Sequence, residues 1–385
     1  MIMLVNRRKF LLGSGAFGIG ALSGCHGLQM GTGTYSISIL GDTHFDTAPQ
    51  TVYHKGWVPS HEKDWRDRQG EFARNAAMWA DRLPRLVASA AAVRRPDAKY
   101  LFQMGDLIQG DCAGRADYLR FLADAQVACT KGFDGLPFLT VCGNHDIRNG
   151  GAGPYDEYMR ALVSRTLGKT VGRSSFLFFE GPDAFIFIDF MRPDADRISA
   201  MLDASEGVRH TFIVLHSAIA PTDTWGSYWF LFGKPEDTAR RRALFTRLLR
   251  RRAIVLSGHI HHTQIRRWKR AEGELVEFCM NSVWRKAEDV VTPLITRPDQ
   301  LGSYVKAHPA PMNEEHDGCH QRRTVPELLA LVEEYRPGLV DYRQFRAAGH
   351  YQLIVTEKTV DMVFYACDAR RPTMVFPLRG GSCLL

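Results

Sequence analysis

Five short motifs place acidic, amide or imidazole side chains directly after apolar runs of the sequence. They are GDTH (41–44), GDLIQG (105–110), GNHD (143–146), VLHS (214–217) and GHIHH (258–262). Oxygen and imidazole ligands suit Mn, Fe or Zn ions, whereas copper(I) and structural zinc sites favour thiolates. The sequence contains no C-x-x-C pair. The motifs therefore predict chemistry with divalent metal ions that are bound through oxygen and nitrogen.

The runs before these motifs have the composition of strands that are buried on both faces. They read YSISILGD, KYLFQMGD, PFLTVCGN, TFIVLHS and AIVLSGH. Helix-like stretches at 67–92, 117–130 and 237–252 alternate with them, which indicates an α/β fold. Because ligands gather at the carboxyl ends of strands in such sheets, we expect the five motifs to converge.

Convergence would place carboxylates, a carboxamide and at least four imidazoles in one pocket. Left without partners, so many desolvated polar groups would cost several kcal/mol. Metal coordination satisfies them, and two ions that share a carboxylate use this number of ligands more fully than one ion. Two-metal sites with ions roughly 3.5–4 Å apart serve phosphoryl chemistry, in which they activate water and neutralise phosphate oxygens.

The same motifs, in the same order, resemble those of the calcineurin-like metallophosphoesterase superfamily: D-x-H, G-D-x-x, G-N-H-[DE], H and G-H-x-H. The resemblance implies that Asp106 bridges two divalent ions, with Mn, Fe and Zn as the candidates. It implies that one ion is bound by Asp42, His44, Asp106 and His261, and the other by Asp106, Asn144, His216 and His259.

Three residues beside these ligands are expected to act on the substrate or on its surroundings. In the resemblance, His145 stabilises the phosphoryl charge or protonates the leaving oxygen, which suits an imidazole with a pKa near neutral. Asp146 would hold the far nitrogen of that imidazole and fix its tautomer. Arg148 matches a phosphate oxygen with two donors. His262 is either a pocket residue or an ordinary polar position beside the site.

The resemblance also implies a four-layer α/β/β/α sandwich in one domain, 35–385, with two stacked mixed sheets flanked by helices. A hairpin is expected over 174–190, because Gly181 and Pro182 separate two β-rich runs. The segment 293–338 is expected to be an irregular excursion around one helix at 325–335, and the strands at 350–366 to lie at a sheet edge. Aromatic stretches at 45–65 and 221–233 either line the substrate pocket or cover the edge of the core.

The first 25 residues have a basic start, an apolar stretch and small residues at their end, as export signals do. Arg7 and Arg8 resemble a twin-arginine signal, and Leu22 to Cys25 resembles a lipobox in which Cys25 is acylated. The alternatives are a plain secretory peptide or an uncleaved anchor. A linker over 26–34 would then join a periplasmic domain to a lipid anchor in a bacterial envelope.

Charge and cysteine content limit the partners. Without the leader the chain has 46 Lys and Arg against 42 Asp and Glu, a net charge of +4, which does not argue for nucleic acid. The runs Arg240–Arg242, Arg250–Arg252 and Arg266–Arg267 are expected on solvated faces.

Seven cysteines besides Cys25 are irregularly spaced, so an oxidising compartment permits one or two disulfides without indicating a pairing. Seven further histidines are expected at the surface or in local structure: His54, His61, His210, His308, His316, His320 and His350.

The motifs favour a hydrolase of small phosphate mono- or diesters, in which a metal-bound hydroxide attacks phosphorus and His145 assists. The alternative is a non-catalytic binding or scaffold protein on the same fold. Such a protein would be expected to have lost the D-x-H pair or the histidine of GNHD, and this chain keeps Asp42, His44 and His145.

Overall fold

The computed structural model describes residues 33–47, 62–221, 230–286, 291–308 and 325–381. The leader with Cys25, most of the linker, Cys319 and Cys383 lie outside the described residues, as do His54, His61, His316 and His320. Large parts of both aromatic stretches, at 48–61 and 222–229, lie outside them too. None of the described helices is both long and apolar enough to cross a membrane.

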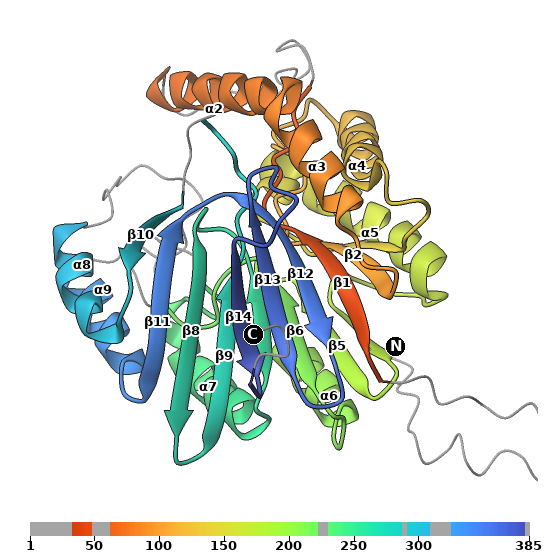
Figure 1. Cartoon of the computed structure of the whole chain (residues 1–385). Coiled ribbons are helices and arrows are strands. Elements are labelled where there is room, and N and C mark those ends of the chain that lie inside the picture. The colour runs from red at the N-terminus through yellow and green to blue at the C-terminus, as the bar shows by residue number, and fades with distance from the viewer. Residues whose placement is uncertain (1–32, 48–61, 222–229, 287–290, 309–324, 382–385) are drawn as a thin grey trace, which may run out of the picture.

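The first sheet has six strands in the order β14-β13-β12-β1-β2-β3 (Figure 1). The strands β1 (Tyr35–Leu40), β2 (Ala98–Gln103) and β3 (Phe138–Thr140) are parallel to one another. The strands β12 (Gly349–Val355), β13 (Val360–Ala366) and β14 (Met374–Arg379) continue the sheet in antiparallel fashion from β1. The strands at 350–366 therefore lie inside the sheet, where an edge position was expected, because β14 pairs with β13 and forms the edge.

The second sheet has eight strands in the order β10-β11-β8-β9-β7-β6-β5-β4. Its middle, β5 (Asp183–Ile188), β6 (Thr211–Leu215), β7 (Ile254–Ser257) and β9 (Gly273–Cys279), is parallel. The flanks are antiparallel: β4 (Phe176–Glu180) on one side, and β8 (Thr263–Arg270), β11 (Leu339–Arg346) and β10 (Thr292–Ile295) on the other. The expected hairpin is confirmed, since Glu180 pairs with Asp183 across Gly181 and Pro182.

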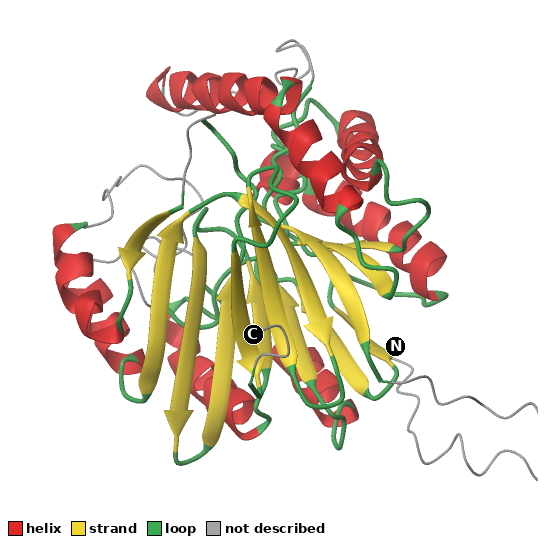
Figure 2. Cartoon of the chain, viewed as in Figure 1, coloured by secondary structure: helices red, strands yellow, loops and turns green. Residues whose placement is uncertain are grey.

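Helices cover the outer faces of the two stacked sheets, so the expected sandwich of two mixed sheets with flanking helices is confirmed (Figure 2). The first sheet is flanked by α3 (Arg82–Ala92), α4 (Arg115–Thr130) and α5 (Ala152–Leu167). The second is flanked by α6 (Ala195–Ala204), α7 (Thr238–Arg250), α8 (Leu301–Ala307) and α9 (Val325–Tyr335). One apolar core lies between the sheets, and another lies between the second sheet and its helices.

The helix expected over 67–92 is two helices, α2 (Glu62–Ala80) and α3, separated at Asp81. Asp81 has φ −140° and ψ −64°, which is not helical. Pro84 explains the break, because its ring would clash with the carbonyl of Ala80 in a continuous helix. The described part of the segment 293–338 is more regular than expected, since it contains most of β10, one short 3₁₀ turn (Pro298–Gln300) and the helices α8 and α9.

Two arginines that were expected in solvent are buried, since Arg241 and Arg266 are each 2% exposed. His350, which was expected at the surface or in local structure, is fully buried on β12. Each of the two arginines has oxygen partners, since Arg241 bonds Tyr335 and Phe232, and Arg266 forms an ion pair on the second sheet. The described cysteines, Cys112, Cys129, Cys142, Cys279 and Cys367, form no disulfide with one another.

Candidate metal centre

All five motifs lie at the same end of the two sheets, below α2 in the view of Figure 1. Those of the first sheet follow β1, β2 and β3, and those of the second follow β6 and β7. The strands before them are parallel within each sheet, so their carboxyl ends meet. Stacking the sheets then brings residues that are more than 200 positions apart into contact.

A first group joins Asp42, His44 and His261. The His44 Nε2 atom lies 3.0 Å from Nε2 of His261, and the latter lies 3.3 Å from Oδ2 of Asp42. Asp42 is fully buried and also accepts the backbone N–H of His259. These are three of the four residues that the motifs assign to one ion.

A second group joins Asp106, His216 and His259. The Nε2 atom of His216 lies 3.2 Å from Oδ2 of Asp106 and 3.2 Å from Nδ1 of His259. His216 directs Nδ1 to the carbonyl of Met104 at 2.7 Å. That bond places a proton on Nδ1, so Nε2 is the nitrogen that faces Asp106 and can bind a metal ion once it loses its proton, as is usual for a metal-binding histidine.

Asp106 also links the two groups. Its Oδ2 atom lies 3.7 Å from Nε2 of His44 and 4.0 Å from Nε2 of His145, and these three residues form a third group of potential ligands. The backbone N–H of His145 donates to the other carboxylate oxygen of Asp106 at 2.8 Å. The carboxylate thus occupies the central position that a bridging ligand requires.

The Nδ1 atom of His145 has a different hydrogen-bond partner from the expected Asp146. Its Nδ1 atom lies 3.0 Å from the carbonyl of Gln109, so a backbone oxygen and not Asp146 fixes the tautomer. The Asp146 carboxylate accepts the backbone N–H groups of Ile108 and Gly143, at 3.1 and 2.9 Å. Asp146 therefore joins the loops after β2 and β3, and the role predicted for it at the imidazole is wrong.

Four of the predicted ligands have backbone conformations that side chains rarely adopt. The φ angles of His44, Asp106, His259 and His261 are 41°, 49°, 76° and 51°. Non-glycine residues in this region cost on the order of 1–3 kcal/mol each and persist where the surrounding structure determines them. The strain is concentrated at the strand ends that carry the ligands, as expected for a functional site.

The glycines of the motifs allow loops to approach ligands closely. A Cβ atom on Gly258 would lie 2.4 Å from Oδ1 of Asp42, and one on Gly143 would lie 2.1 Å from the backbone nitrogen of Asp106. Such contacts are far shorter than carbon can make. The motif GHIHH therefore needs glycine because the Asp42 carboxylate occupies the space of a side chain.

Burial and neighbouring charges set the protonation of the cluster. Burial would raise the pKa of the Asp106 carboxyl, but the imidazoles of His216 and His145 outweigh it and hold that pKa well below its usual range. Burial opposes charge on His216, yet Asp106 and Asp42 raise its pKa to about 9. Burial lowers the pKa of His44 to about 4, and burial with the charge of His216 lowers that of His259 well below its usual range. Neutral imidazoles beside an ionised carboxylate are ready ligands.

The donor set fits divalent metal ions. In each of the pairs His44–His261 and His216–His259, two ring nitrogens face each other, 3.0 and 3.2 Å apart, so both rings of a pair can bind one ion. The Oδ1 atom of Asn144, the remaining predicted ligand, is buried without a hydrogen-bond partner. A cation between such atoms would satisfy all of them at once.

Sequence comparison assigns the family. A profile of calcineurin-like phosphoesterases matches residues 35–263, more than half of the chain. The chain belongs to the calcineurin-like phosphoesterase family. In this family setting, the clustered His and Asp side chains indicate a divalent metal centre. No curated protein sequence matches the chain significantly.

Solved structures with this fold include phosphatases. The purple acid phosphatase PPD1 from yellow lupin (Lupinus luteus) seeds has a TM-score of 0.50 at 10% identity, over 90% of this chain and 54% of its own. PhoD has a TM-score of 0.48 at 10% identity, over 91% and 72%. A dimetal phosphatase from Danio rerio has 0.44 at 10% identity, over 90% and 99%. At such identity the similarity to the lupin enzyme shows the fold alone. The present chain, a calcineurin-like phosphoesterase, spans about half the length of the lupin enzyme.

The helix α2 contacts the loops of the first sheet, which the sequence did not reveal. Its residues Glu71, Asn75 and Trp79 are four apart and therefore share one face. Trp79 donates to the carbonyl of Thr43 at 2.8 Å, and Asn75 and Glu71 bind the side-chain amide of Gln109 at 2.5 and 2.9 Å. The one feature of the sequence that could have pointed to this helix contact is the glutamine within GDLIQG.

Arg148 and His262, the predicted substrate contacts, lie beside the cluster with other neighbours. The Arg148 guanidinium lies 3.3 Å from the Glu71 carboxylate and 3.7 Å from that of Asp111. His262 is half-buried directly after His261. A phosphate contact by either residue stays a prediction.

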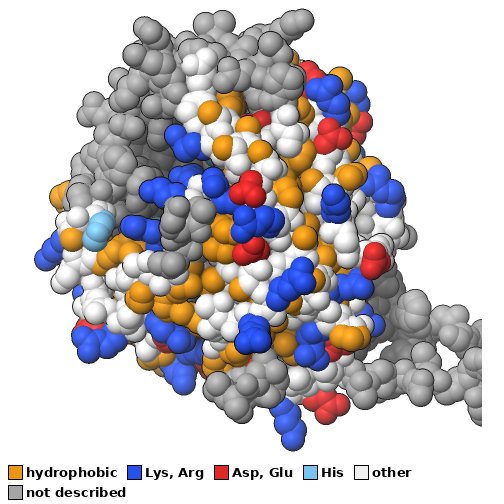
Figure 3. Space-filling view, turned by 45° about the horizontal axis from the view of Figure 1, so that its top comes forward, with side chains coloured by type: hydrophobic (Ala, Val, Ile, Leu, Met, Phe, Trp, Pro, Cys, Tyr) orange, Lys and Arg blue, Asp and Glu red, His pale blue; other side chains and the backbone are white. Residues whose placement is uncertain are grey.

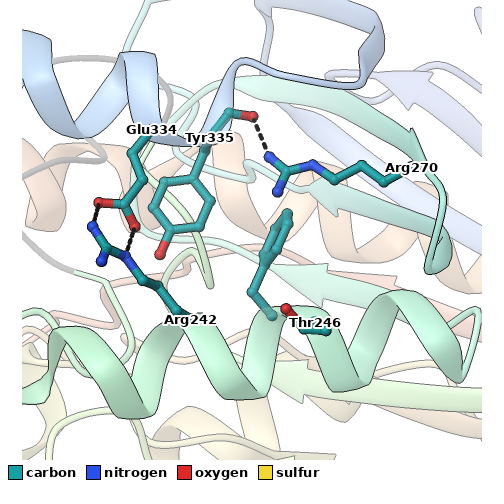
Figure 4. Close-up of a pocket in the computed structure, with 6 residues that line it drawn as sticks. Arg242, Thr246, Arg270, Glu334 and Tyr335 are labelled. Carbon is teal, nitrogen blue, oxygen red and sulfur yellow. Dashed lines mark hydrogen bonds and ion pairs between the residues drawn. The ribbon is translucent and has the colours of Figure 1, made fainter.

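A separate pocket of about 230 Å³ lies between α7, α9 and the end of β8 (Figure 4). Its charged groups already have partners. Arg242 forms a bidentate ion pair with Glu334, and Arg270 donates to the carbonyls of Pro337 and Tyr335. The pocket is smaller than ordinary small-molecule sites, which are roughly 300–1,000 Å³. It lies at the opposite end of β8 from His261.

Lys and Arg side chains are spread over the face seen in Figure 3 in several groups, with Asp and Glu side chains among them. Among the described residues of that face, the mixture forms no continuous basic band of the kind that follows a nucleic-acid backbone.

Proposed function

We propose that the protein is a dinuclear-metal hydrolase of small phosphate mono- or diesters. The observation that carries the proposal is the linked set of His and Asp groups, in which Asp106 stands between Asp42, His44 and His261 on one side and His216 and His259 on the other. Mn, Fe and Zn ions suit these ligands. Asn144 would complete the second set through its buried Oδ1 atom.

The side chains divide the work of hydrolysis. The bound ions would supply an activated water and neutralise phosphate oxygens. The Nδ1–H group of His145 donates to the carbonyl of Gln109, so its Nε2 atom is the one that takes up or releases a proton near the leaving oxygen. The Asp106 carboxylate, 4.0 Å from that atom, stabilises the protonated ring. Arg148, held by Glu71, would contact a phosphate oxygen.

The experiment is metal analysis with hydrolysis of a panel of mono- and diesters, on the wild type and on His145→Ala. We expect two divalent ions per chain, turnover of at least one ester, and a loss of roughly 10²–10⁴-fold in kcat for His145→Ala with the metals retained. The exposed His308→Ala is the control. Bound metals with no turnover of any ester would favour a binding or scaffold protein instead.

We also propose that the protein is exported through a twin-arginine signal and anchored in a bacterial envelope by a lipid on Cys25. The support is the order of Arg7 and Arg8, an apolar stretch and Leu22-Ser23-Gly24-Cys25. Cell fractionation and mass spectrometry of the wild type and of Cys25→Ser test it. Recovery of the wild type in the cytoplasm, or an unmodified Cys25 in the exported protein, would contradict it.

A further inference from the structure

We infer that the buried ion pair between Arg266 and Glu277 positions His216 and His259, two ligands of the same predicted ion. The inference rests on the proposed metal centre and adds two residues to it that the five motifs do not contain. It is carried by hydrogen bonds that join this pair to the loops of both histidines.

The pair lies across two neighbouring strands of the second sheet. Arg266 on β8 and Glu277 on β9 stand directly opposite each other in the antiparallel register. Their side chains are 2% and 0% exposed, and Nη2 of Arg266 lies 2.9 Å from Oε1 of Glu277. Both charges are therefore removed from water and compensate each other.

One side of the pair holds the chain after His216. The backbone N–H of Ile219, three residues beyond that histidine, donates to Oε1 of Glu277 at 3.3 Å. The next residue, Ala220, accepts a 2.9 Å bond from Nη1 of Arg266 through its carbonyl. The two partners of one ion pair thus bind the N–H of Ile219 and the carbonyl of Ala220. These bonds fix the direction in which this loop leaves β6.

The same carboxylate oxygen also holds the chain before His259. The hydroxyl of Ser257, two residues before that histidine, donates to Oε1 of Glu277 at 3.3 Å. The two loops contact each other as well, because the N–H of Gly258 donates to the carbonyl of His216 at 2.8 Å. Glu277 therefore binds both segments whose imidazoles lie 3.2 Å apart at the metal centre.

Stability alone does not explain a charged pair at this place. Removing two ions from water costs several kcal/mol each, and a pair of well-packed apolar side chains is often equally or more stable. Two such residues would bury well in a sheet whose neighbouring positions, Ile265, Trp268, Val276 and Phe278, are fully buried. They could not bind Ile219, Ala220 or Ser257. We attribute the pair to the orientation of the two loops, which sets the direction of both imidazoles.

The test is the double variant Arg266→Met/Glu277→Leu, which removes both charges together. Titration with Mn²⁺ or Zn²⁺ by calorimetry should show one of the two ions bound roughly 10- to 100-fold more weakly, as is typical when outer partners of metal ligands are lost. The other ion, near Asp42, His44 and His261, should keep its affinity to within a factor of about three. The Tm of the metal-free protein should fall, because the buried N–H of Ile219 and the buried carbonyl of Ala220 lose their partners.

The matched control is Arg209→Met/Asp183→Leu. This pair is also largely buried, with 2.6 Å between Nη2 and Oδ2, but it lies at the opposite end of β5 and β6 from the metal ligands. Its loss should lower stability or leave it unchanged without weakening either ion selectively. A selective loss in this control as well would overturn the inference.

Equal affinities in the Arg266→Met/Glu277→Leu variant and the wild type would overturn the positioning role. Should that variant fail to fold, Glu277→Gln decides, because it keeps the shape and still predicts a selective, smaller loss for one ion. Wild-type protein that binds both ions but hydrolyses no ester would contradict the proposed function and leave this comparison of affinities valid.

Discussion

The ligands of the first sheet and those of the second are supported by different neighbours. In the first sheet, the loops of Thr43, Gln109 and Arg148 are bound by α2, whose Glu71 side chain is 35% exposed. In the second sheet, the loops of His216 and His259 are bound by an ion pair that is at most 2% exposed. The contacts of one half of the candidate metal centre thus include a side chain that reaches solvent, whereas those of the other half come from an ion pair within the core.

The difference suggests a division between turnover and metal binding. We expect the α2 contacts, with His145 and Arg148, to lie on the side from which the proposed substrate enters. The Arg266–Glu277 pair instead binds the loops that carry His216 and His259. Variants in the first set should alter kcat or KM with the metals retained, and variants in the second set should alter metal affinity.

The largest effect is expected where the two halves meet. Asp106→Asn removes a carboxylate that lies within 4.0 Å of ring nitrogens of His44, His145 and His216. Both ions should bind more weakly, by more than the roughly 10- to 100-fold that loss of an outer partner costs. Calorimetric titration and ester turnover check this, with the exposed Asp196→Asn as the control. Loss of only one ion would show that Asp106 is not shared.

A second large effect is expected from Gly258→Ala, because the new Cβ atom would meet Oδ1 of Asp42 at 2.4 Å. Displacing Asp42 should weaken metal binding by on the order of 10-fold or more, with a matching loss of activity. Gly153→Ala is the matched control, since no atom lies within 4 Å of its added Cβ. Unchanged metal affinity in Gly258→Ala would refute the packing argument.

A smaller effect, confined to turnover, is expected on the α2 side. Gln109→Met removes the bonds to Asn75 and Glu71 while the main-chain carbonyl that holds His145 remains. We predict a fall of roughly 10-fold in kcat with both metal affinities unchanged. Gln126→Met, which breaks one bond to Tyr158 on the outer helices, is the control. Weaker binding of either ion by Gln109→Met would contradict the proposed division of roles between the two halves.

The smallest effect on activity is expected at His350, whose side chain contacts the Ala369 carbonyl and the Tyr365 ring and is not part of the cluster. Burial lowers the pKa of His350 to about 4 from 6.5, so the folded state holds it neutral. Its contribution to stability is complete above about pH 6.5 and falls as the pH drops toward 4, by up to about 3 kcal/mol. Urea unfolding at pH 7 and pH 4.5 should show a smaller difference for His350→Gln than for the wild type. An equal difference would contradict the prediction, and His308→Gln is the exposed control.

The candidate ligands could be named from the sequence because each follows closely after a buried strand, and the motif and the apolar run before it are both local patterns. Asp42, His44 and Asp106 could be placed from strand order alone, and the structure brings them together. Gly258 is part of a motif that the sequence shows, but the reason for glycine at this position is a contact with a carboxylate 216 positions earlier. That contact depends on how two sheets stack, which no local pattern contains.

The supporting residues could not be predicted for the same reason. Arg266 is followed by another arginine, Arg267, and was expected in solvent, but strand register places it opposite Glu277 inside the second sheet. The helix contacts of Gln109 required the break at Asp81, which turns α2 across the loops. Asp146 was expected at the imidazole of His145, where the Gln109 carbonyl lies instead.

The central claim is that two divalent ions share Asp106, and anomalous diffraction from crystals soaked in Mn²⁺ tests it most directly. The account predicts two peaks roughly 3.5–4 Å apart. One should contact Asp42, His44, Asp106 and His261, and the other Asp106, Asn144, His216 and His259. A single peak, or peaks that do not contact Asp106, would contradict it.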